Sequence, residues 1–345
     1  AIASILPVDK LLQPRDYINA WQLFIALGIL IVGAVICGLK GSLVMVAPAV
    51  VSQPLGAPSM MPFIFITIAC GAISGFHSLV ASGTTAKQLN HETDAVPVGY
   101  GSMLIEGALA VMVIIACCAG IGLGYPSESG GMLTGIQAWN SHYFSWGASA
   151  GLASKLQAVV IGCANMMTSI GISQSLGVVI MGVFIASFAG TTLDTSTRLQ
   201  RYIISEIFDA SNLKVSVWVS TSIAVISAAI LAFSSGFSGK GALQLWPLFG
   251  ALNQLLATFG LGLLSIYLLK IRSKYIFVSA LPFLFMAVIT IWACIENQLS
   301  FFITKKWLLF IMNGIVILIA FYILSAFFDR FQKFRRQTHI KLKLN

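Results

Sequence analysis

The stretch ISGFHSLVASGTTAKQL (Ile73–Leu89) places a histidine, several hydroxyl groups, glycines and a lysine directly after an apolar segment. Glycine accommodates backbone angles that end a helix, and hydroxyl groups can bond to the backbone groups that such an end leaves free. A helix that ends inside a membrane protein presents oriented amides and carbonyls, which attract anions and cations respectively. An ordinary helix end with a lysine that reaches toward the membrane surface explains the same residues. The candidate binding residues of this stretch are His77, Ser78, Ser82, Gly83, Thr84, Thr85 and Lys87.

A second polar stretch, SFAGTTLDTSTRLQRY (Ser187–Tyr202), also follows an apolar segment. The apolar helix is expected to end at Gly190, after which a threonine can cap a new helix that carries Asp194 in its first turn. Asp194 and Arg198 stand four residues apart, the spacing at which two side chains can pair on one helix face. The pair is either a lock beside a binding site or an exposed ion pair that contributes little stability. The other candidate binding residues here are Thr191 and Thr192.

Two further side chains have the chemistry of a proton carrier. Glu106 lies just inside an expected membrane span, where an acid is costly and usually faces a cavity or a partner, and burial would favour its neutral form. If the helix starts a few residues later, Glu106 is only interfacial. His77 is the other candidate, because histidine is the residue type that can change charge near neutral pH, although a lone histidine is more often a packing residue. Together with the carboxylate of Asp194, these side chains give the expected proton carriers, which are Glu106 or Asp194, with His77 as the reserve candidate.

Amide side chains interrupt another apolar run, Leu245–Leu256. Asn253 and Gln254 are expected to bond between helices or to line a cavity, and Asn253 is the candidate binding residue. The loop Asn90–Asp94 holds a histidine and two acids, but three clustered residues are weak evidence for a metal site. The sequence shows no nucleotide-binding or hydrolase motif in a suitable context. We expect no catalytic residue, no metal site and no cofactor.

The elements that must position these residues are membrane helices. Only 9% of the 345 residues are charged, against about 25% in a soluble domain, and 58% are hydrophobic. The mean hydropathy is +0.92, and apolar runs of about 20 residues recur along the chain. These values exclude a soluble protein. The six cysteines all lie inside apolar runs without metal-type spacing, and we expect them to be buried packing residues.

Hydropathy predicts an all-α polytopic membrane protein with about eight crossings. The region Ser154–Gly190 is too long for one crossing and is expected to hold one crossing and a half-helix. The loop Gly124–Gly151 is rich in glycine and aromatic residues, which is typical of an interfacial loop or a short re-entrant segment. The eight expected crossings are Tyr17–Leu39, Met61–Ala81, Ser102–Leu123, Ser154–Gly190, Val215–Ser235, Leu245–Leu269, Tyr275–Ile295 and Trp307–Phe328.

The distribution of positive charge predicts the orientation of these helices. Cytoplasmic loops carry an excess of lysine and arginine. If the C-terminal tail is cytoplasmic, fifteen of the twenty lysines and arginines fall on the cytoplasmic side. Both termini are therefore expected in the cytoplasm, and the net charge of +9 does not indicate nucleic-acid binding.

Five stretches together resemble the carbon starvation protein A family. They are LLQPRDYIN, GFHSLVASGTTAKQL, ETDAVPVGYGSMLIEG, SFAGTTLDTSTRLQRY and LWPLFGALNQLLA, and the resemblance extends in order from about Leu11 to the last span. Members of that family are bacterial inner-membrane transporters associated with peptide uptake in starvation and with pyruvate–proton symport. The family in turn resembles the amino acid–polyamine–organocation superfamily, which uses inverted repeats and broken helices.

The resemblance implies proton-coupled uptake of a pyruvate-like carboxylate or a short peptide across the bacterial inner membrane. It also implies a single transmembrane transporter domain over residues 1–345, with a cytoplasmic segment at 1–16 and a basic cytoplasmic tail at 329–345. Family members carry several more helices before LLQPRDYIN, so we expect either a fragment or a separate chain that supplies them. Two alternatives remain: an intramembrane enzyme that uses His77 with Asp194 or Glu106, and a channel or structural membrane subunit.

Overall fold

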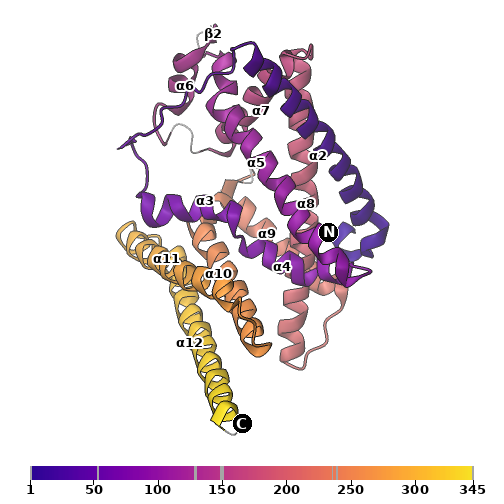
Figure 1. The fold of residues 1–345 in the computed structure, drawn as a ribbon, viewed down its shortest axis with the longest axis vertical. Helices are drawn as coiled ribbons and strands as arrows, with labels where there is room; N and C mark the ends of the chain where they lie inside the picture. Colours follow the sequence, from indigo (N-terminus) through magenta and orange to yellow (C-terminus); the bar gives the residue numbers. More distant parts are fainter. Residues whose placement is uncertain are drawn as a thin grey trace. The chain divides into compact units, whose positions relative to one another are not determined.

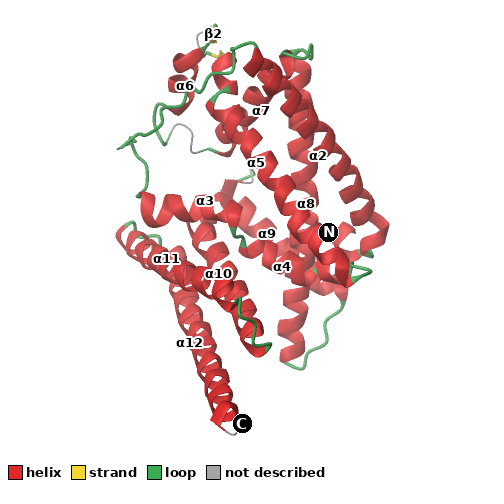
Figure 2. Cartoon of the chain, in the orientation of Figure 1, coloured by secondary structure: helices red, strands yellow, loops and turns green. Residues whose placement is uncertain are grey.

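The structure is a computed structural model that describes residues 2–52, 54–127, 130–147, 151–234, 236–237 and 240–343. Parts of the expected 124–151 loop, the last residue of the expected Val215–Ser235 crossing and the side chains of the basic tail from 334 onward lie outside the described residues. Most of the described chain is helical (Figures 1 and 2). Within the described ranges the strands are two residues long, β1 (Tyr125–Pro126) and β2 (Met132–Leu133), and they pair antiparallel.

In the part of the chain that the structure describes, seven helical segments are long and apolar enough to cross a membrane, which confirms the polytopic all-α class. An eighth expected crossing is present as an apolar helix of 17 residues, α9 (Val217–Phe233). The long region around 154–190 is divided between two helices, α7 (Leu152–Thr168) and the much longer α8 (Gln174–Ala210). The seven segments are Asp9–Leu39, Met60–Lys87, Glu92–Leu123, Gln174–Ala210, Leu248–Lys270, Ile276–Ile303 and Trp307–Lys333.

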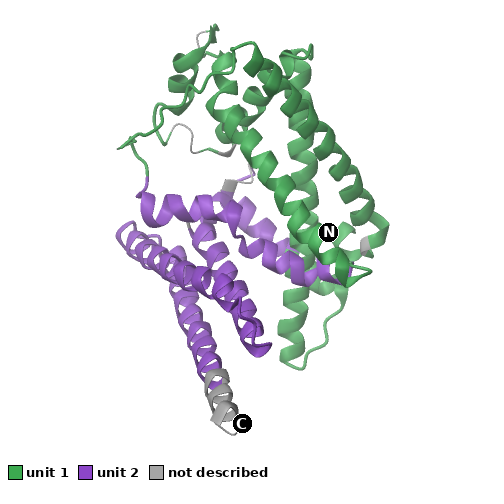
Figure 3. Cartoon of the chain, in the orientation of Figure 1, with its two compact units in different colours: residues 1–57, 89–224 green, residues 58–88, 225–345 purple. Residues whose placement is uncertain are grey.

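The chain groups into two compact units, which are interleaved in sequence (Figure 3). Unit 1 comprises Ala1–Ala57 and Leu89–Ala224, and unit 2 comprises Pro58–Gln88 and Val225–Asn345. The boundary at Ala224 falls inside α9. The prediction of one domain over the whole chain stays a prediction. Residues 8–16 of the expected N-terminal segment already belong to the first long helix, which begins at Val8.

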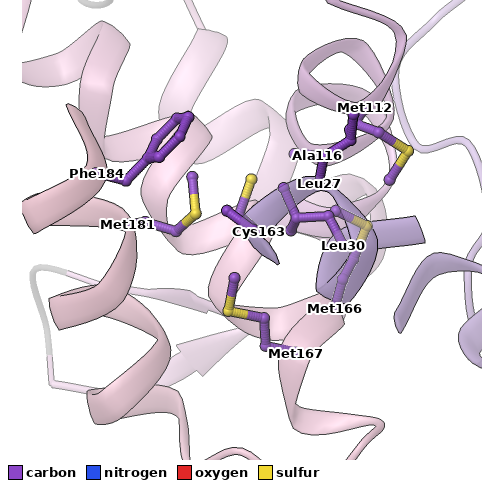
Figure 4. Packing of buried hydrophobic residues seen from close by; sticks show 10 residues of the cluster. Leu27, Leu30, Met112, Ala116, Cys163, Met166, Met167, Met181 and Phe184 are labelled. Atoms are coloured by element: carbon purple, nitrogen blue, oxygen red, sulfur yellow. The ribbon is translucent and has the colours of Figure 1, made fainter. Parts of the chain in front are cut away.

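Unit 1 is built from helices that pack around a core rich in methionine. Leu30 of α2, Ala116 of α5, Met166 of α7 and Met181 of α8 meet there (Figure 4). Methionine is flexible and fills irregular gaps between helices. The elements of unit 1 are α1 (Ile2–Ile5), α2 (Val8–Leu39), η3 (Glu92–Asp94), η4 (Pro97–Gly101), α5 (Ser102–Cys118), η5 (Gly120–Leu123), β1, β2, α6 (Gly135–Tyr143), α7, α8 and the first part of α9.

Unit 2 packs an interrupted helix against a bundle of three long helices. Ile66 of α3, Ala251 of α10 and Ala293 of α11 form part of its core. Two short helices, α3 and α4, occupy the place of one expected crossing. The elements of unit 2 are η1 (Met60–Ile64), α3 (Phe65–Ala72), α4 (Gly75–Gly83), η2 (Thr85–Lys87), the last part of α9, η6 (Lys240–Leu245), α10 (Trp246–Lys270), α11 (Ile276–Ile303) and α12 (Trp307–Lys343).

The predicted helix break at Gly190 is wrong, because α8 continues through it without interruption. The threonines that were expected to cap a new helix bond instead to carbonyls one turn earlier in the same helix. Thr191 Oγ1 donates to the Ser187 carbonyl at 3.2 Å, and Thr192 Oγ1 donates to the Phe188 carbonyl at 3.0 Å. This back-bonding satisfies the hydroxyl groups without ending the helix.

Candidate functional site

The helix that leads into the first polar stretch is interrupted in unit 2, at the start of that stretch. Helix α3 ends at Ala72, Ile73 and Ser74 take extended backbone angles, and α4 starts at Gly75. A helix break was expected within the stretch Ile73–Leu89, and it lies at the first two residues of that stretch, inside the expected Met61–Ala81 crossing. The expected helix end is also present, since α4 stops at Gly83. An interruption at membrane depth requires partners for the backbone groups that it frees.

The side chain of Asn253 on α10 bonds to both halves of the interrupted helix. The Phe76 backbone N–H, in the first turn of α4, donates to Asn253 Oδ1 at 2.8 Å. Asn253 Nδ2 donates to Cys70 Sγ on α3 at 3.0 Å and to Ser74 Oγ at 3.3 Å. Asn253 is 3% exposed, so its amide is largely used by the protein itself. The predicted hydrogen bonding of this amide between helices is therefore found, from α10 to both α3 and the start of α4.

The other candidate side chains of this stretch are distributed along α4 and the turn that follows. Ser78 Oγ donates to the Gly75 carbonyl at 2.7 Å, and Ser82 Oγ donates to the Ser78 carbonyl at 3.1 Å. Thr84 Oγ1 donates to the Val80 carbonyl at 2.9 Å. His77 and Lys87 are exposed. These hydroxyl groups thus have partners inside their own helix, as at an ordinary helix end.

In unit 1, a row of polar side chains joins α2 to α8. Arg15 and Asn19 on α2 face Ser187, Thr191 and Asp194 on α8. Asn19 Nδ2 donates to Thr191 Oγ1 at 2.6 Å, Arg15 Nη2 donates to the same oxygen at 3.2 Å, and the Ser187 hydroxyl donates to Asn19 Oδ1. The numbering rises along α2 as it falls along α8, so the two helices run antiparallel. We call these five residues the α2–α8 polar row.

An ion pair closes the α2–α8 polar row. Arg15 Nη1 donates to Asp194 Oδ2, and the two side chains are 33% and 17% exposed. The predicted Asp194–Arg198 pair is wrong. Arg198 is 3% exposed, and its Nη2 donates to the carbonyls of Ala3 at 2.9 Å and Leu6 at 2.7 Å. Helical spacing allowed the pair, but an arginine from another helix satisfies the carboxylate instead.

Sequence reasoning did not identify Arg15, Asn19 or Ser187. A signal was present, because Arg15 and Asn19 stand four residues apart on α2, and Ser187, Thr191 and Asp194 are spaced by four and three residues on α8. Such spacing puts side chains on one helix face. Among the predicted residues of unit 1, the structure thus joins Thr191 and Asp194. Glu106 on α5 and Thr192 on α8 are exposed and lie outside the row.

A second polar contact in unit 1 lies outside the candidate spans. His142 on α6 is 4% exposed, and its Nδ1 shares a 2.8 Å hydrogen bond with the hydroxyl of the buried Tyr125. His142 Nε2 is buried and has no partner among the described residues. Burial lowers the pKa of His142 from its ordinary value, because desolvation penalises the charged imidazolium.

The lowered pKa predicts a loss of stability in acid. In a window below about pH 6.5 the unfolded chain binds a proton at His142 while the folded chain does not, so stability is complete above that pH and falls as the pH falls through the window. We expect the melting temperature in detergent to drop between about pH 7 and about pH 5. His142→Gln should flatten this slope, because it removes the group that takes up the proton only in the unfolded chain. Equal slopes in wild type and His142→Gln would contradict the assignment.

Comparison with known proteins places these features in a family context. The model of the family described as carbon starvation protein CstA matches residues 1–293. The Peptide transporter CstA of Campylobacter jejuni is 34% identical over 346 residues, covering 87% of this chain and 48% of that protein. The Pyruvate/proton symporter BtsT of Escherichia coli is 31% identical, covering 85% of this chain and 48% of that protein. The chain spans about half the length of these curated relatives, and no solved structure matches it.

Proposed function

The chain belongs to the carbon starvation protein CstA family, and on that premise we propose that it forms part of a proton-coupled transporter of small carboxylates. The substrate would be a pyruvate-like acid or a short peptide. Relatives at 30–34% identity are named as peptide transporters, and one relative at 31% is named as a pyruvate/proton symporter. None of these names describes an enzyme. The proposal extends to a bacterial inner-membrane location with both termini in the cytoplasm and to further helices from another part of the protein or a separate chain.

The observation that carries this proposal is the α2–α8 polar row. Both helices are candidate membrane spans, and the row places an arginine, a carboxylate and three uncharged polar side chains between them. Ionisable side chains inside membrane spans are costly, and they usually mark the path of a substrate or an ion. Asp194 is a suitable proton carrier because it is partly buried and holds a cation that a substrate could also engage. Glu106 and His77 remain secondary candidates for the coupling proton.

The interruption between α3 and α4 supports the same function. Broken helices in transporters present free backbone groups and helix ends to substrates and ions. The proposed binding residues near this interruption and in α8 are His77, Ser78, Ser82, Gly83, Thr84, Thr85, Lys87, Asn253, Thr191, Thr192 and Arg198. Arg198 would act by holding the N-terminal segment, since its guanidinium bonds to the carbonyls of Ala3 in α1 and of Leu6 directly after it. For the alternative of an intramembrane enzyme, no contact of His77 with an acid supports a catalytic pair among the described residues.

Uptake into proteoliposomes tests the proposal. We expect the complete transporter that contains this chain to accumulate labelled pyruvate or a labelled dipeptide when an inward proton gradient is imposed, and to accumulate much less without it. Asp194→Asn should abolish the response to the gradient, and Glu106→Gln tests the second acid in the same assay. Gradient-driven uptake that survives in both variants would refute the coupling assignment. Uptake that is equal with and without the gradient would refute proton coupling itself.

A further inference from the structure

We propose that Arg15 is the carboxylate-binding residue of this transporter, and that a substrate carboxylate takes the place of Asp194 when Asp194 is protonated. This inference rests on the proposed function and assigns its substrate contact. The proton goes to the Asp194 carboxylate, the Arg15–Asp194 ion pair separates, and the guanidinium pairs with the incoming carboxylate. One positive and one negative charge enter together, so transport of a monocarboxylate is electroneutral.

The contacts of Arg15 fit this exchange. Its Nη1 donates to Asp194 Oδ2, and its Nη2 donates to Thr191 Oγ1 at 3.2 Å. A guanidinium has five N–H donors in a planar fork that matches both oxygens of a carboxylate. Asp194 presents one carboxylate oxygen to Arg15 Nη1, and Arg15 Nη2 is paired only with the uncharged hydroxyl oxygen of Thr191. A substrate carboxylate could therefore occupy both terminal nitrogens at once, which is the stronger, bidentate arrangement.

The partial burial of the Arg15–Asp194 ion pair couples proton binding to carboxylate binding. The Asp194 side chain is 17% exposed and the Arg15 side chain is 33% exposed, so each charge is partly removed from water. Neutralising Asp194 alone would leave the Arg15 guanidinium partly buried without a counter-charge, which is unfavourable. A bound substrate carboxylate supplies the missing counter-charge to Arg15. Proton binding and carboxylate binding at this place therefore favour each other.

The surroundings hold Arg15 at the position that the exchange needs. Asn19 donates to Thr191 and accepts from Ser187, which fixes the neutral end of the α2–α8 polar row. Gly190 leaves room for the guanidinium, because a Cβ atom at that position would lie 3.2 Å from Arg15 Nη2. The hydrogen bonds of Asn19 with Thr191 and Ser187 can thus stay in place while Arg15 exchanges Asp194 for the substrate carboxylate.

Other ionisable groups near Asp194 have different environments. On α8 itself, Arg198 bonds to carbonyls of Ala3 and Leu6. Helix α1 brings the Ser4 hydroxyl within 3.5 Å of the Asp194 carbonyl and contains no ionisable side chain. Helix α2 adds Asp16, which is exposed. The ionisable side chains of α7, which also packs against α8, are Lys155 and Cys163. The carboxylate that faces Arg15 in the α2–α8 polar row is therefore that of Asp194.

Three variants of the complete transporter test the exchange in proteoliposomes. Arg15→Lys keeps the charge but removes the fork, and we expect the KM for pyruvate or a dipeptide to rise about tenfold or more. Asp194→Asn imitates the protonated state, so it should retain exchange of labelled for unlabelled substrate while it loses the response to a proton gradient. Lys10→Gln, at an exposed position on α2, is the matched control and should behave as wild type.

Two further measurements separate this inference from the proposed function. The amide of the same substrate, which lacks the carboxylate charge, should not compete for uptake, and an imposed membrane potential should not change the rate of pyruvate uptake. Wild-type uptake driven by the proton gradient together with an unchanged KM in Arg15→Lys, or with strong voltage dependence, would overturn the exchange and leave the proposed function standing. Absence of any carboxylate uptake by wild type would overturn both.

Discussion

Replacement of Gly75 by alanine is expected to disrupt unit 2 and to lower sharply the yield of folded protein. The added Cβ atom would lie 2.1 Å from the Asn253 backbone oxygen and 2.4 Å from Leu256 Cβ on α10. Side-chain overpacking alone costs about 1–3 kcal/mol. At Gly75 the nearest obstructing atom is the backbone oxygen of Asn253, which cannot rotate away as a side chain could. We therefore expect a larger loss in the free energy of unfolding. The melting temperature in detergent and the monodisperse fraction in size-exclusion chromatography measure it.

Gly71→Ala is the matched control for this prediction. Gly71 lies on α3, four residues before Gly75 and on the other side of the interruption at Ile73 and Ser74, and a Cβ atom added there would meet nothing within 4 Å. The four-residue spacing of the two glycines resembles a helix-packing motif, but the helix is interrupted between them, and of the two only Gly75 would bring an added Cβ atom against α10. We expect Gly71→Ala to stay within about 0.5 kcal/mol of wild type. Equal losses in the two variants would contradict the α4–α10 contact.

The second large effect is expected at Gly162, where α7 crosses α5 in unit 1. A Cβ atom at Gly162 would lie 2.1 Å from the Ala116 backbone oxygen, and Ala116 is itself fully buried in the methionine-rich core. Helices in membranes gain stability mainly from close packing, so separating this pair removes contacts that lipid does not replace. We expect Gly162→Ala to reduce the melting temperature strongly and to lower accumulation in the membrane.

Gly107→Ala provides the comparison within the same unit. Gly107 lies on α5, and a Cβ atom there would meet nothing within 4 Å. The variant adds the same methyl group to the helix that Gly162 touches, so it separates a packing clash from a general effect of alanine. We expect it to melt close to wild type. If Gly162→Ala melts at the temperature of Gly107→Ala, the tight crossing of α5 and α7 is wrong.

Much of the fold follows from hydropathy along the chain. Seven of the expected crossings, including those that contain α2, α5 and α10, correspond to helical segments of suitable length and composition. This succeeds because a membrane span is a local property: about 20 consecutive apolar residues, with every backbone bond made inside the segment. Family membership was also readable from sequence, since the polar stretches that interrupt the apolar runs are long and distinctive.

The continuity of α8 was not readable in this way. Glycine, threonine and aspartate around position 190 are all residues that favour helix ends in water. In the structure the threonine hydroxyls bond to carbonyls of the preceding turn, and Gly190 makes room for Arg15. The same residues therefore serve helix packing. Local propensity describes a segment alone and does not include the helix that lies against it.

What the sequence by itself determined was the membrane class, the approximate spans, the family and the polar stretches where the chemistry lies. Only the tertiary structure decided that Asp194 pairs with Arg15, which is 179 residues away, and that Asn253 bonds to both sides of the α3–α4 interruption. The physical reason is the separation along the chain over which each signal acts. Hydropathy and helical periodicity are sums over neighbouring residues, whereas the partner of a buried polar group depends on which faces of distant helices meet.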